Sequence, residues 1–176
     1  MTPQDQLLGL CLKIQIGFPR FQRIGSRGQA GREGGWKLDG LRPHGGIQPL
    51  VNTRTRKVSS YETLLRWNRP GHGLVSPALF ISCAEETGII VPLGEWVIRK
   101  AIEEAAQWKD DVAVAINLSP AQMKNPSLLA TIVGALAASQ LDPSRLEIEI
   151  VESVLMDETE HNIRTLHALR ELGVKI

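Results

Sequence analysis

Short apolar runs that end in an oxygen-bearing side chain alternate with helical patterns along much of this 176-residue chain. Residues 112–116 and 146–151 have the length of strands, and segments of helical period lie between and after them. Strands that alternate with helices predict a parallel sheet in an α/β fold. Ligands of such folds bind outside the carboxyl ends of the strands, so we expect the functional residues there.

An earlier stretch, residues 58–67, places Glu62 and Arg66 within an apolar run. If the stretch is one strand, Glu62, Leu64 and Arg66 share a face, because side chains alternate with a period of two. A buried carboxylate needs a cation, hydrogen bonds or a metal, since burying it alone is costly. Taken alone, this stretch favours the simpler alternative, a weak and solvated surface pair.

Three predicted strands carry Glu62, Asn117 and Glu149 toward their carboxyl ends. Because a parallel sheet gathers these ends at one edge, we expect the three side chains to line a shared pocket.

Sequence patterns predict the remaining elements as well. The helix at 92–108 carries an apolar stripe that includes Trp96, and the strand at 145–152 places Glu147 beside Glu149 on one face. The other expected elements are a strand at 47–51, a helix from Pro77 to Glu86 with Ser76 as its cap, a helix at 157–172 and the start of a fifth strand at 174–176.

Basic residues and glycines are concentrated at the amino terminus. Residues 1–57 contain ten Lys or Arg and three Asp or Glu, whereas residues 58–176 contain ten and sixteen. A segment rich in Arg and Gly cannot bury enough apolar surface to offset its ordering entropy, so we expect residues 1–45 to be disordered. Such segments can bind nucleic acid, but an unstructured basic tail is the commoner case, and a non-native reading frame is a third alternative.

The cysteines and the apolar segments bear on the location of the chain. Cys11 and Cys83 are too few for a disulfide framework and lack metal-ligand spacing, which favours a reduced, cytoplasmic setting. The first residues have no positively charged region of the secretory type. No stretch approaches the roughly 20 apolar residues of a membrane-spanning helix, so we expect no membrane segment.

Seven motifs follow one another from residue 61 to the end of the chain. They are YETLLRW at 61–67, LVSP with FI at 74–81, AEETG at 84–88, LGEWV at 93–97, INLSP at 116–120, LEIEIVES at 146–153 and LGVKI at 172–176. In this order they resemble the EAL domain, a phosphodiesterase domain that hydrolyses the bacterial second messenger cyclic di-GMP. The triplet that names the family reads Glu62-Thr63-Leu64 here, with Thr in place of the usual Ala.

The resemblance implies a TIM-like (β/α)8 barrel for residues 46–176. A complete barrel typically needs about 250 residues, so we expect only its first four to five strands, preceded by the disordered segment. An unclosed barrel exposes a parallel edge, which favours aggregation, homodimerisation or pairing with a complementing half.

The resemblance also implies a two-metal site. Glu62, Asn117 and Glu149 would hold Mg²⁺ or Mn²⁺, ions that prefer oxygen ligands. Two such cations can activate a water molecule and neutralise the charge of a phosphodiester.

The same resemblance assigns four residues to the substrate and its surroundings. Gln48, Leu64 and Arg66 would bind cyclic di-GMP, with the Arg66 guanidinium paired to a phosphate. Glu152 would steady a loop beside the site, in a supporting role.

The family's site requires further groups: the paired aspartates of an Asp-Asp-Phe-Gly-Thr-Gly segment, a lysine on the following strand, another metal-binding glutamate and a late glutamine. These groups are not among the 176 residues, so we expect weak two-metal binding and negligible turnover by this chain alone. The alternative is a non-catalytic module that binds a nucleotide or a protein partner.

Overall fold

The computed structural model describes residues 14–15, 47–69, 73–151 and 159–176. Its larger sheet has four strands in the order β2-β3-β6-β7, with β2 antiparallel to β3 and the other neighbours parallel. The strands are β2 (Ile47–Val51), β3 (Val58–Thr63), β6 (Ala113–Leu118) and β7 (Leu146–Ile150). The prediction of an α/β fold with a parallel sheet is confirmed.

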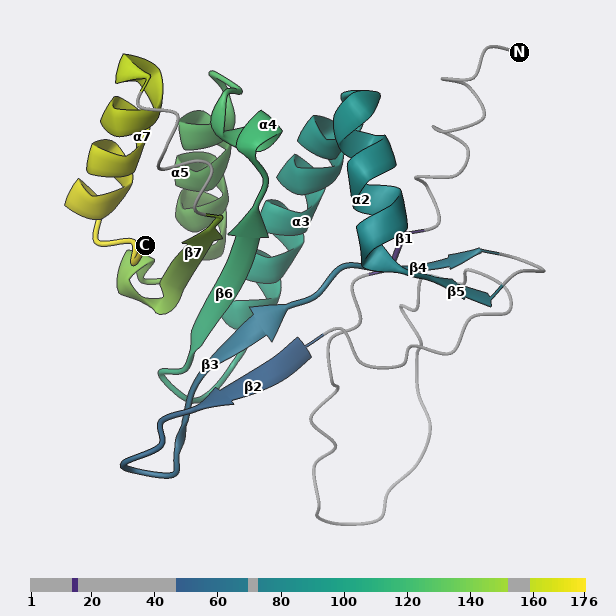
Figure 1. The fold of residues 1–176 in the computed structure, drawn as a ribbon. Helices are drawn as coiled ribbons and strands as arrows, with labels where there is room; N and C mark the ends of the chain where they lie inside the picture. Colours follow the sequence, from purple (N-terminus) through teal and green to yellow (C-terminus); the bar gives the residue numbers. More distant parts are fainter. Residues whose placement is uncertain (1–13, 16–46, 70–72, 152–158) are drawn as a thin grey trace, which may run out of the picture.

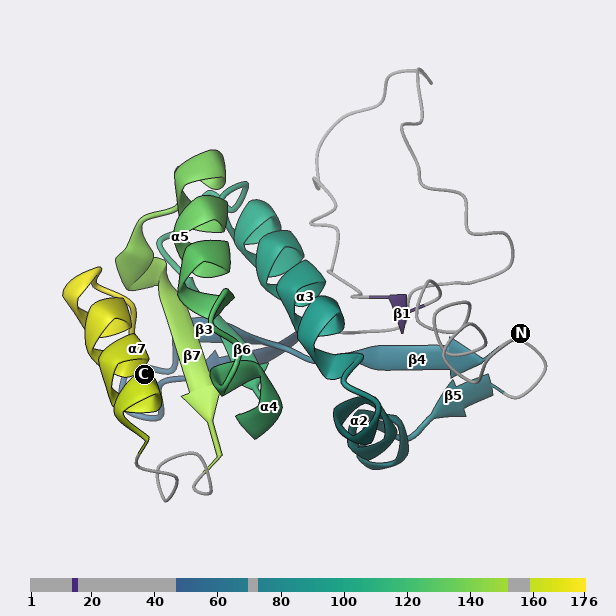
Figure 2. The same cartoon turned by 90° about the horizontal axis from the view of Figure 1, so that it is seen from above.

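Helices cover one face of this sheet. They are α3 (Ile90–Ala105) and α5 (Leu128–Ser139), which lie behind the strands in Figure 1, and α7 (Glu160–Glu171), which lies beside β7 at the edge of the sheet. No helix in the described part of the chain covers the opposite face (Figures 1 and 2). The sheet therefore has one face packed into a core and one face that is open.

A second, smaller sheet overturns the prediction of one strand at 58–67. The strand β3 ends at Thr63, and Arg66 begins β4 (Arg66–Arg69), which belongs to an antiparallel sheet of order β1-β4-β5. The physical reason is tertiary: Trp67 pairs with Val75 and its ring meets Phe80 edge-on, with centroids 5.8 Å apart. Glu62 and Arg66 therefore lie in different sheets, and the predicted common face is wrong.

The other two strands of the small sheet flank β4. They are β1 (Ile14–Gln15) and β5 (Gly73–Val75). Apart from Ile14–Gln15, the segment 1–45, which is predicted to be disordered, lies outside the described residues.

The main core fills the space between the four-stranded sheet and its helices. Strand β7 contributes Leu146 and Ile148, which are buried, as their predicted alternation requires. Helix α3 contributes Ile98 and Ile102, whereas Trp96, which was expected on the apolar stripe, is 39% exposed. The Trp96 side chain lies outside the core because Ile98 and Ile102, and not the indole, form the buried face of α3.

Helix starts follow the predicted signals in most respects. Helix α2 (Pro77–Glu86) begins with Pro77 in its first turn, although the Ser76 side chain makes no capping hydrogen bond. The short helix α4 (Pro120–Met123) has a full capping box: the Ser119 N–H donates to Gln122 Oε1 at 3.0 Å, and the Gln122 N–H donates to Ser119 Oγ at 3.4 Å.

Strand β7 is tied to neighbouring elements before its amino end and along its outer edge. Arg145, in the 3-10 helix η1 (Pro143–Arg145) before β7, donates hydrogen bonds to the carbonyls of Ala105, Asp110 and Val112. On the far side of β7, the Ile148 N–H donates to Lys175 O at 2.8 Å, and the Lys175 N–H donates to Leu146 O at 3.0 Å. This parallel bridge confirms the predicted start of a fifth strand.

No helix within the described ranges is long and apolar enough to cross a membrane.

Candidate metal and nucleotide site

The structure places Glu62, Asn117 and Glu149 at equivalent positions. Each is the last residue but one of its strand, in β3, β6 and β7 respectively. Asn117 stands opposite Glu149 in the ladder, and Glu62 stands opposite Ala115, which shares a face with Asn117. All three side chains therefore belong to the open face of the sheet, at the carboxyl end of its parallel strands.

A hydrogen bond joins two of these side chains. Asn117 Nδ2 donates a hydrogen bond to Glu62 Oε1 at 2.9 Å. The remaining polar atom of the amide, Oδ1, is the one that suits a cation. Strand β6 extends two residues beyond the predicted end at residue 116, so Asn117 is held by the ladder instead of following it.

The electrostatics of this face favour a cation. Partial burial raises the pKa of the Glu149 carboxyl above its usual value, and repulsion from Glu62 and from Glu147 raises that pKa further. Like charges gathered on one face are relieved when a positive ion binds between them. The donor set of two carboxylates and an amide oxygen therefore fits a hard divalent cation. Among the described residues, no three His, Cys, Asp or Glu side chains are grouped closely enough to hold a metal, so this donor set includes the amide of Asn117 and only two carboxylates.

Two residues beside the trio extend the open face. Gln48 stands opposite Glu62 in the antiparallel pair of β2 and β3, so it shares that face and is exposed. Glu147 stands opposite Ala115 and adds a third carboxylate. Sequence reasoning placed Glu147 on this face but gave it no role; its spacing of two residues from Glu149 was the available signal.

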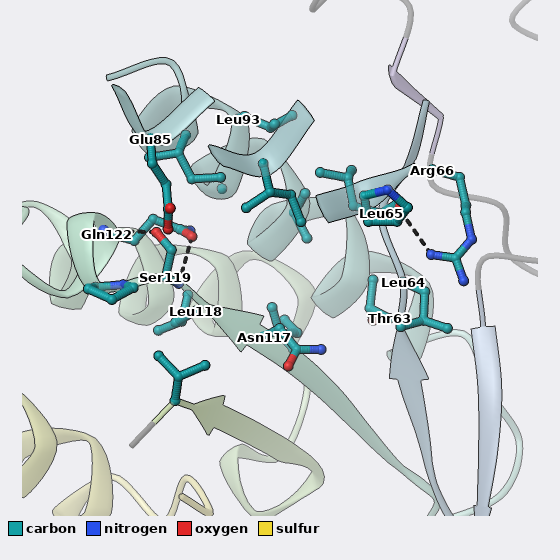
Figure 3. Close-up of a pocket in the computed structure, with 18 residues that line it drawn as sticks. Thr63, Leu64, Leu65, Arg66, Glu85, Leu93, Asn117, Leu118, Ser119 and Gln122 are labelled. Carbon is teal, nitrogen blue, oxygen red and sulfur yellow. Dashed lines mark hydrogen bonds between the residues drawn. The ribbon is translucent and has the colours of Figure 1, made fainter. Parts of the chain in front are cut away.

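Leu64 and Arg66 line a cavity of about 590 Å³ at the strand ends, together with Asn117 (Figure 3). Arg66 Nη1 donates to the backbone carbonyl of Leu65 at 3.0 Å. Neither Glu62 nor Glu149 lines this cavity. The structure thus brings Arg66 to the cavity that Asn117 borders but not to the carboxylates. Glu152 lies outside the described residues.

Comparison with known proteins identifies the family. The family model of the EAL domain matches residues 47–176, which is most of the chain. This chain belongs to the EAL domain family. The fold agrees: the "PaMucR Phosphodiesterase, c-di-GMP complex" superposes with a TM-score of 0.69 at 36% identity, over 73% of this chain and 53% of that one. The described sheet and helices are therefore part of an EAL barrel.

Curated relatives of this EAL chain are much longer. An uncharacterized protein, y4lL of Sinorhizobium fredii, is 51% identical over 127 residues, which is 72% of this chain and 15% of the relative. The bifunctional diguanylate cyclase/cyclic di-GMP phosphodiesterase MucR of Pseudomonas aeruginosa is 37% identical over 133 residues, 73% of this chain and 19% of MucR. The chain thus spans less than a quarter of these relatives.

One further structural neighbour is named as a complex with a metal. The structure named "Klebsiella pneumoniae BlrP1 pH 6 manganese/cy-diGMP complex" superposes with a TM-score of 0.59 at 25% identity, over 73% of this chain and 32% of that one.

Proposed function

We propose that residues 47–176 contribute to a metal-dependent phosphodiesterase site that hydrolyses cyclic di-GMP to its linear dinucleotide in the cytoplasm. The observation that carries this proposal is the placement of Glu62, Asn117 and Glu149 at the same position of three neighbouring strands, on one open face. Membership of the EAL family and the similarity to a structure named as a phosphodiesterase in complex with c-di-GMP support the substrate.

In this proposal the three oxygen-bearing side chains bind Mg²⁺ or Mn²⁺. When bound, the cation supplies a water of lowered pKa and neutralises charge on the phosphate. Glu62 and Glu149 provide negative charge, and Asn117 links them, since its amide already bonds to Glu62. In the metal-free protein the raised pKa of Glu149 reflects the cost of keeping that charge without a counter-ion.

The substrate groups follow from the same arrangement. Arg66 would exchange its bond to the Leu65 carbonyl for a phosphate oxygen, for which its planar fork is suited. Leu64 forms part of the apolar wall beside it, and Gln48 offers an amide at the edge of the open face. Glu152 keeps the supporting role that the resemblance implies.

Metal binding tests the site on the chain itself. Titration with Mn²⁺, followed by the loss of its electron paramagnetic resonance signal, should show weak binding by the wild type, weakened at least tenfold in Glu149→Gln. The control is Glu160→Gln, because Glu160 is an exposed acid on α7 paired with Arg164. Equal Mn²⁺ affinity in the wild type and Glu149→Gln would contradict the assignment of this residue.

Turnover tests the reaction. Because the family's site uses further ligands, we expect negligible hydrolysis of cyclic di-GMP by the 176-residue chain and Mn²⁺-dependent hydrolysis by a chain that also carries those ligands. In the longer chain, Glu62→Gln should abolish hydrolysis. Binding of cyclic di-GMP without hydrolysis by the longer chain would instead indicate the non-catalytic module.

A further inference from the structure

The turn between β2 and β3, residues 52–57, carries three cations at the end of β3 opposite the candidate metal site. Arg54, Arg56 and Lys57 are exposed, and within the described ranges no acid forms an ion pair with them. This basic turn projects below the strands in Figure 1. Residues 58–176 contain sixteen Asp or Glu and ten Lys or Arg, so a positive turn adjoins an acidic domain.

Hydrogen bonds hold the backbone of the basic turn. Asn52 Oδ1 accepts from the N–H groups of Arg54 and Thr55, both at 3.0 Å, and the Arg56 N–H donates to Asn52 O at 2.8 Å. Arg56 has a φ of 57°, a left-handed conformation that Gly or Asn adopts with less strain. The cations are therefore presented on a defined scaffold, and contacts within the described fold give no reason for an arginine at the strained position.

Aliphatic side chains lie directly beside these cations. Val51 and Val58 are partners in the pairing of β2 with β3, and they are 51% and 37% exposed. Residues 52–57 contain no aromatic ring on which a nucleic-acid base could stack. Cations beside exposed aliphatic groups fit the boundary of a lipid bilayer instead, where basic side chains meet anionic headgroups and apolar ones enter the acyl region.

Most of the acids of the domain do not oppose such a contact. Glu62 lies four residues beyond Val58 in β3, about 13 Å along the strand, which exceeds the screening length of about 8 Å at physiological ionic strength. Asp110 and Asp111 precede β6 at the same end as the turn. With Lys109 beside them, they leave an excess of positive charge at this end.

We infer that the basic turn, together with Val51 and Val58, docks the domain end-on onto an anionic phospholipid surface. In this orientation the carboxyl ends of the strands face away from the lipid, so the candidate metal site stays open to solvent. The inference goes beyond the proposed function, because it concerns the opposite end of the strands and requires neither a metal nor cyclic di-GMP.

Sedimentation with vesicles tests the cations. The 176-residue chain, in chelator, should bind phosphatidylcholine vesicles that contain about one-third phosphatidylserine and should not bind pure phosphatidylcholine. A variant with Arg54→Gln, Arg56→Gln and Lys57→Gln should bind the mixed vesicles at least tenfold more weakly, since each basic side chain near such a surface strengthens binding by about fivefold. The basic amino-terminal segment is present in every variant, so the comparison isolates the turn.

The matched control removes the same charge elsewhere. Arg99→Gln, Arg170→Gln and Lys175→Gln replace three exposed cations outside the turn, and together they should weaken binding to the mixed vesicles less than about threefold. An equal loss in both triple variants would mean that only the total charge matters and would overturn the inference. Circular dichroism checks that each variant folds.

The aliphatic pair distinguishes a bilayer from other sources of phosphate. Val51→Thr with Val58→Thr keeps the shape of both side chains, so it should weaken vesicle binding at least about threefold and leave binding of glycerophosphoserine, the soluble headgroup, unchanged. In the wild type, a spin label on the lipid headgroup should broaden the amide signals of Thr53 and Thr55 more than those of α5. Uniform broadening, unchanged vesicle binding by the double variant, or tighter binding to single-stranded DNA than to vesicles would each overturn the inference.

Discussion

Asn117 connects the parts of the candidate site at the scale of single residues. Its side chain bonds to Glu62, its backbone stands opposite Glu149, and it borders the cavity that Arg66 also lines. Glu149, by contrast, has its pKa raised by burial and by neighbouring carboxylates. The candidate site therefore consists of one connecting amide and acidic side chains whose mutual repulsion raises the pKa of Glu149.

The raised pKa of Glu149 predicts that replacing this carboxylate with a neutral side chain stabilises the protein, by an amount that depends on pH. The folded state holds the proton more tightly than the unfolded state, so ionisation costs stability as pH rises above the usual carboxylate pKa of about 4.3. Without metal, Glu149→Gln should raise the melting temperature modestly at pH 7, and this gain should shrink toward zero near pH 4. Thermal melts in chelator across this range provide the measurement.

Asp142 offers a control of opposite sign. Hydrogen bonds from Ser144 hold its pKa below the usual value, and Arg145 lowers it further. Ionised Asp142 therefore stabilises the fold above that usual pKa, and the contribution is lost as pH falls through its lowered value. Asp142→Ala should lower the melting temperature at pH 7 and matter less in acid. If both variants shifted the melting temperature in the same direction at every pH, the electrostatic account of Glu149 would be wrong.

At the scale of elements, helix α3 holds the segment that follows Asn117. Gly94 packs so closely on Gln122 that an added Cβ would clash with the side-chain amide of Gln122. One residue later, Glu95 Oε1 accepts hydrogen bonds from Ser127 Oγ at 2.9 Å and Asn125 Nδ2 at 3.3 Å. Helix α3 thus holds both α4, through Gln122, and the segment that follows α4, through Asn125 and Ser127.

This packing predicts that Gly94→Ala destabilises the protein. In an ordinary helix interior the change from Gly to Ala stabilises by about 1 kcal/mol. Here the new methyl group must displace buried Gln122 and break the capping box with Ser119, so we expect a net loss of about 1–3 kcal/mol in the free energy of unfolding. Urea denaturation measures the difference.

Gly134 is the matched control, because it also lies within a helix, α5, but has no atom within 4 Å of an added Cβ. Gly134→Ala should therefore stabilise by about 0.5–1 kcal/mol. Similar changes of the same sign at both glycines would show that the contact with Gln122 does not decide the outcome.

At the scale of the whole molecule, the described residues form two hydrophobic clusters of unequal size. The larger cluster lies behind the four-stranded sheet and includes Ile98, Ile116 and Leu146. The smaller one has three buried members, Ala84, Ile90 and Leu93, with Leu65 and Trp67 packed against it. Few buried contacts therefore secure α2 and the small sheet.

This inequality predicts two levels of local stability. Amides in the central strand β6 should exchange hydrogen with a free energy close to that of global unfolding. Amides that pair β4 with β5 should exchange through a smaller opening, at least tenfold faster after correction for intrinsic rates. Native-state hydrogen exchange by NMR provides the comparison, and equal protection of β4 and β6 would indicate one cooperative unit.

Local patterns predicted the elements whose environment is set by their own sequence. The alternation of Leu146, Glu147, Ile148 and Glu149 determines which face is buried, and Pro120 after Ser119 marks a helix start. The break at Leu64 and Leu65 could not be found this way, because the same alternation suits one strand or two. Pairing of Trp67 with Val75 decides it, and that contact is not local in the sequence.

The candidate site shows the same division. Strand ends in a parallel sheet predicted that Glu62, Asn117 and Glu149 meet, and the structure brings Glu62 and Asn117 within hydrogen-bond distance. The position of Arg66 could not be predicted, because it depends on whether β4 pairs with the strands of the larger or of the smaller sheet. The exposure of Trp96 could not be predicted either, because an apolar residue at the edge of a helix's apolar stripe can be buried or exposed.

The two-residue break between β3 and β4 has a mechanical consequence. Along one continuous strand, the four steps from Glu62 to Arg66 would fix the distance between their Cα atoms at about 13 Å. Leu64 and Leu65 act instead as a joint between two separately paired sheets. The distance from the Arg66 guanidinium to the carboxylates is therefore set by the angle between the two sheets. A small rotation of the three-stranded sheet would move Arg66 while Glu62 and Glu149 stay in place.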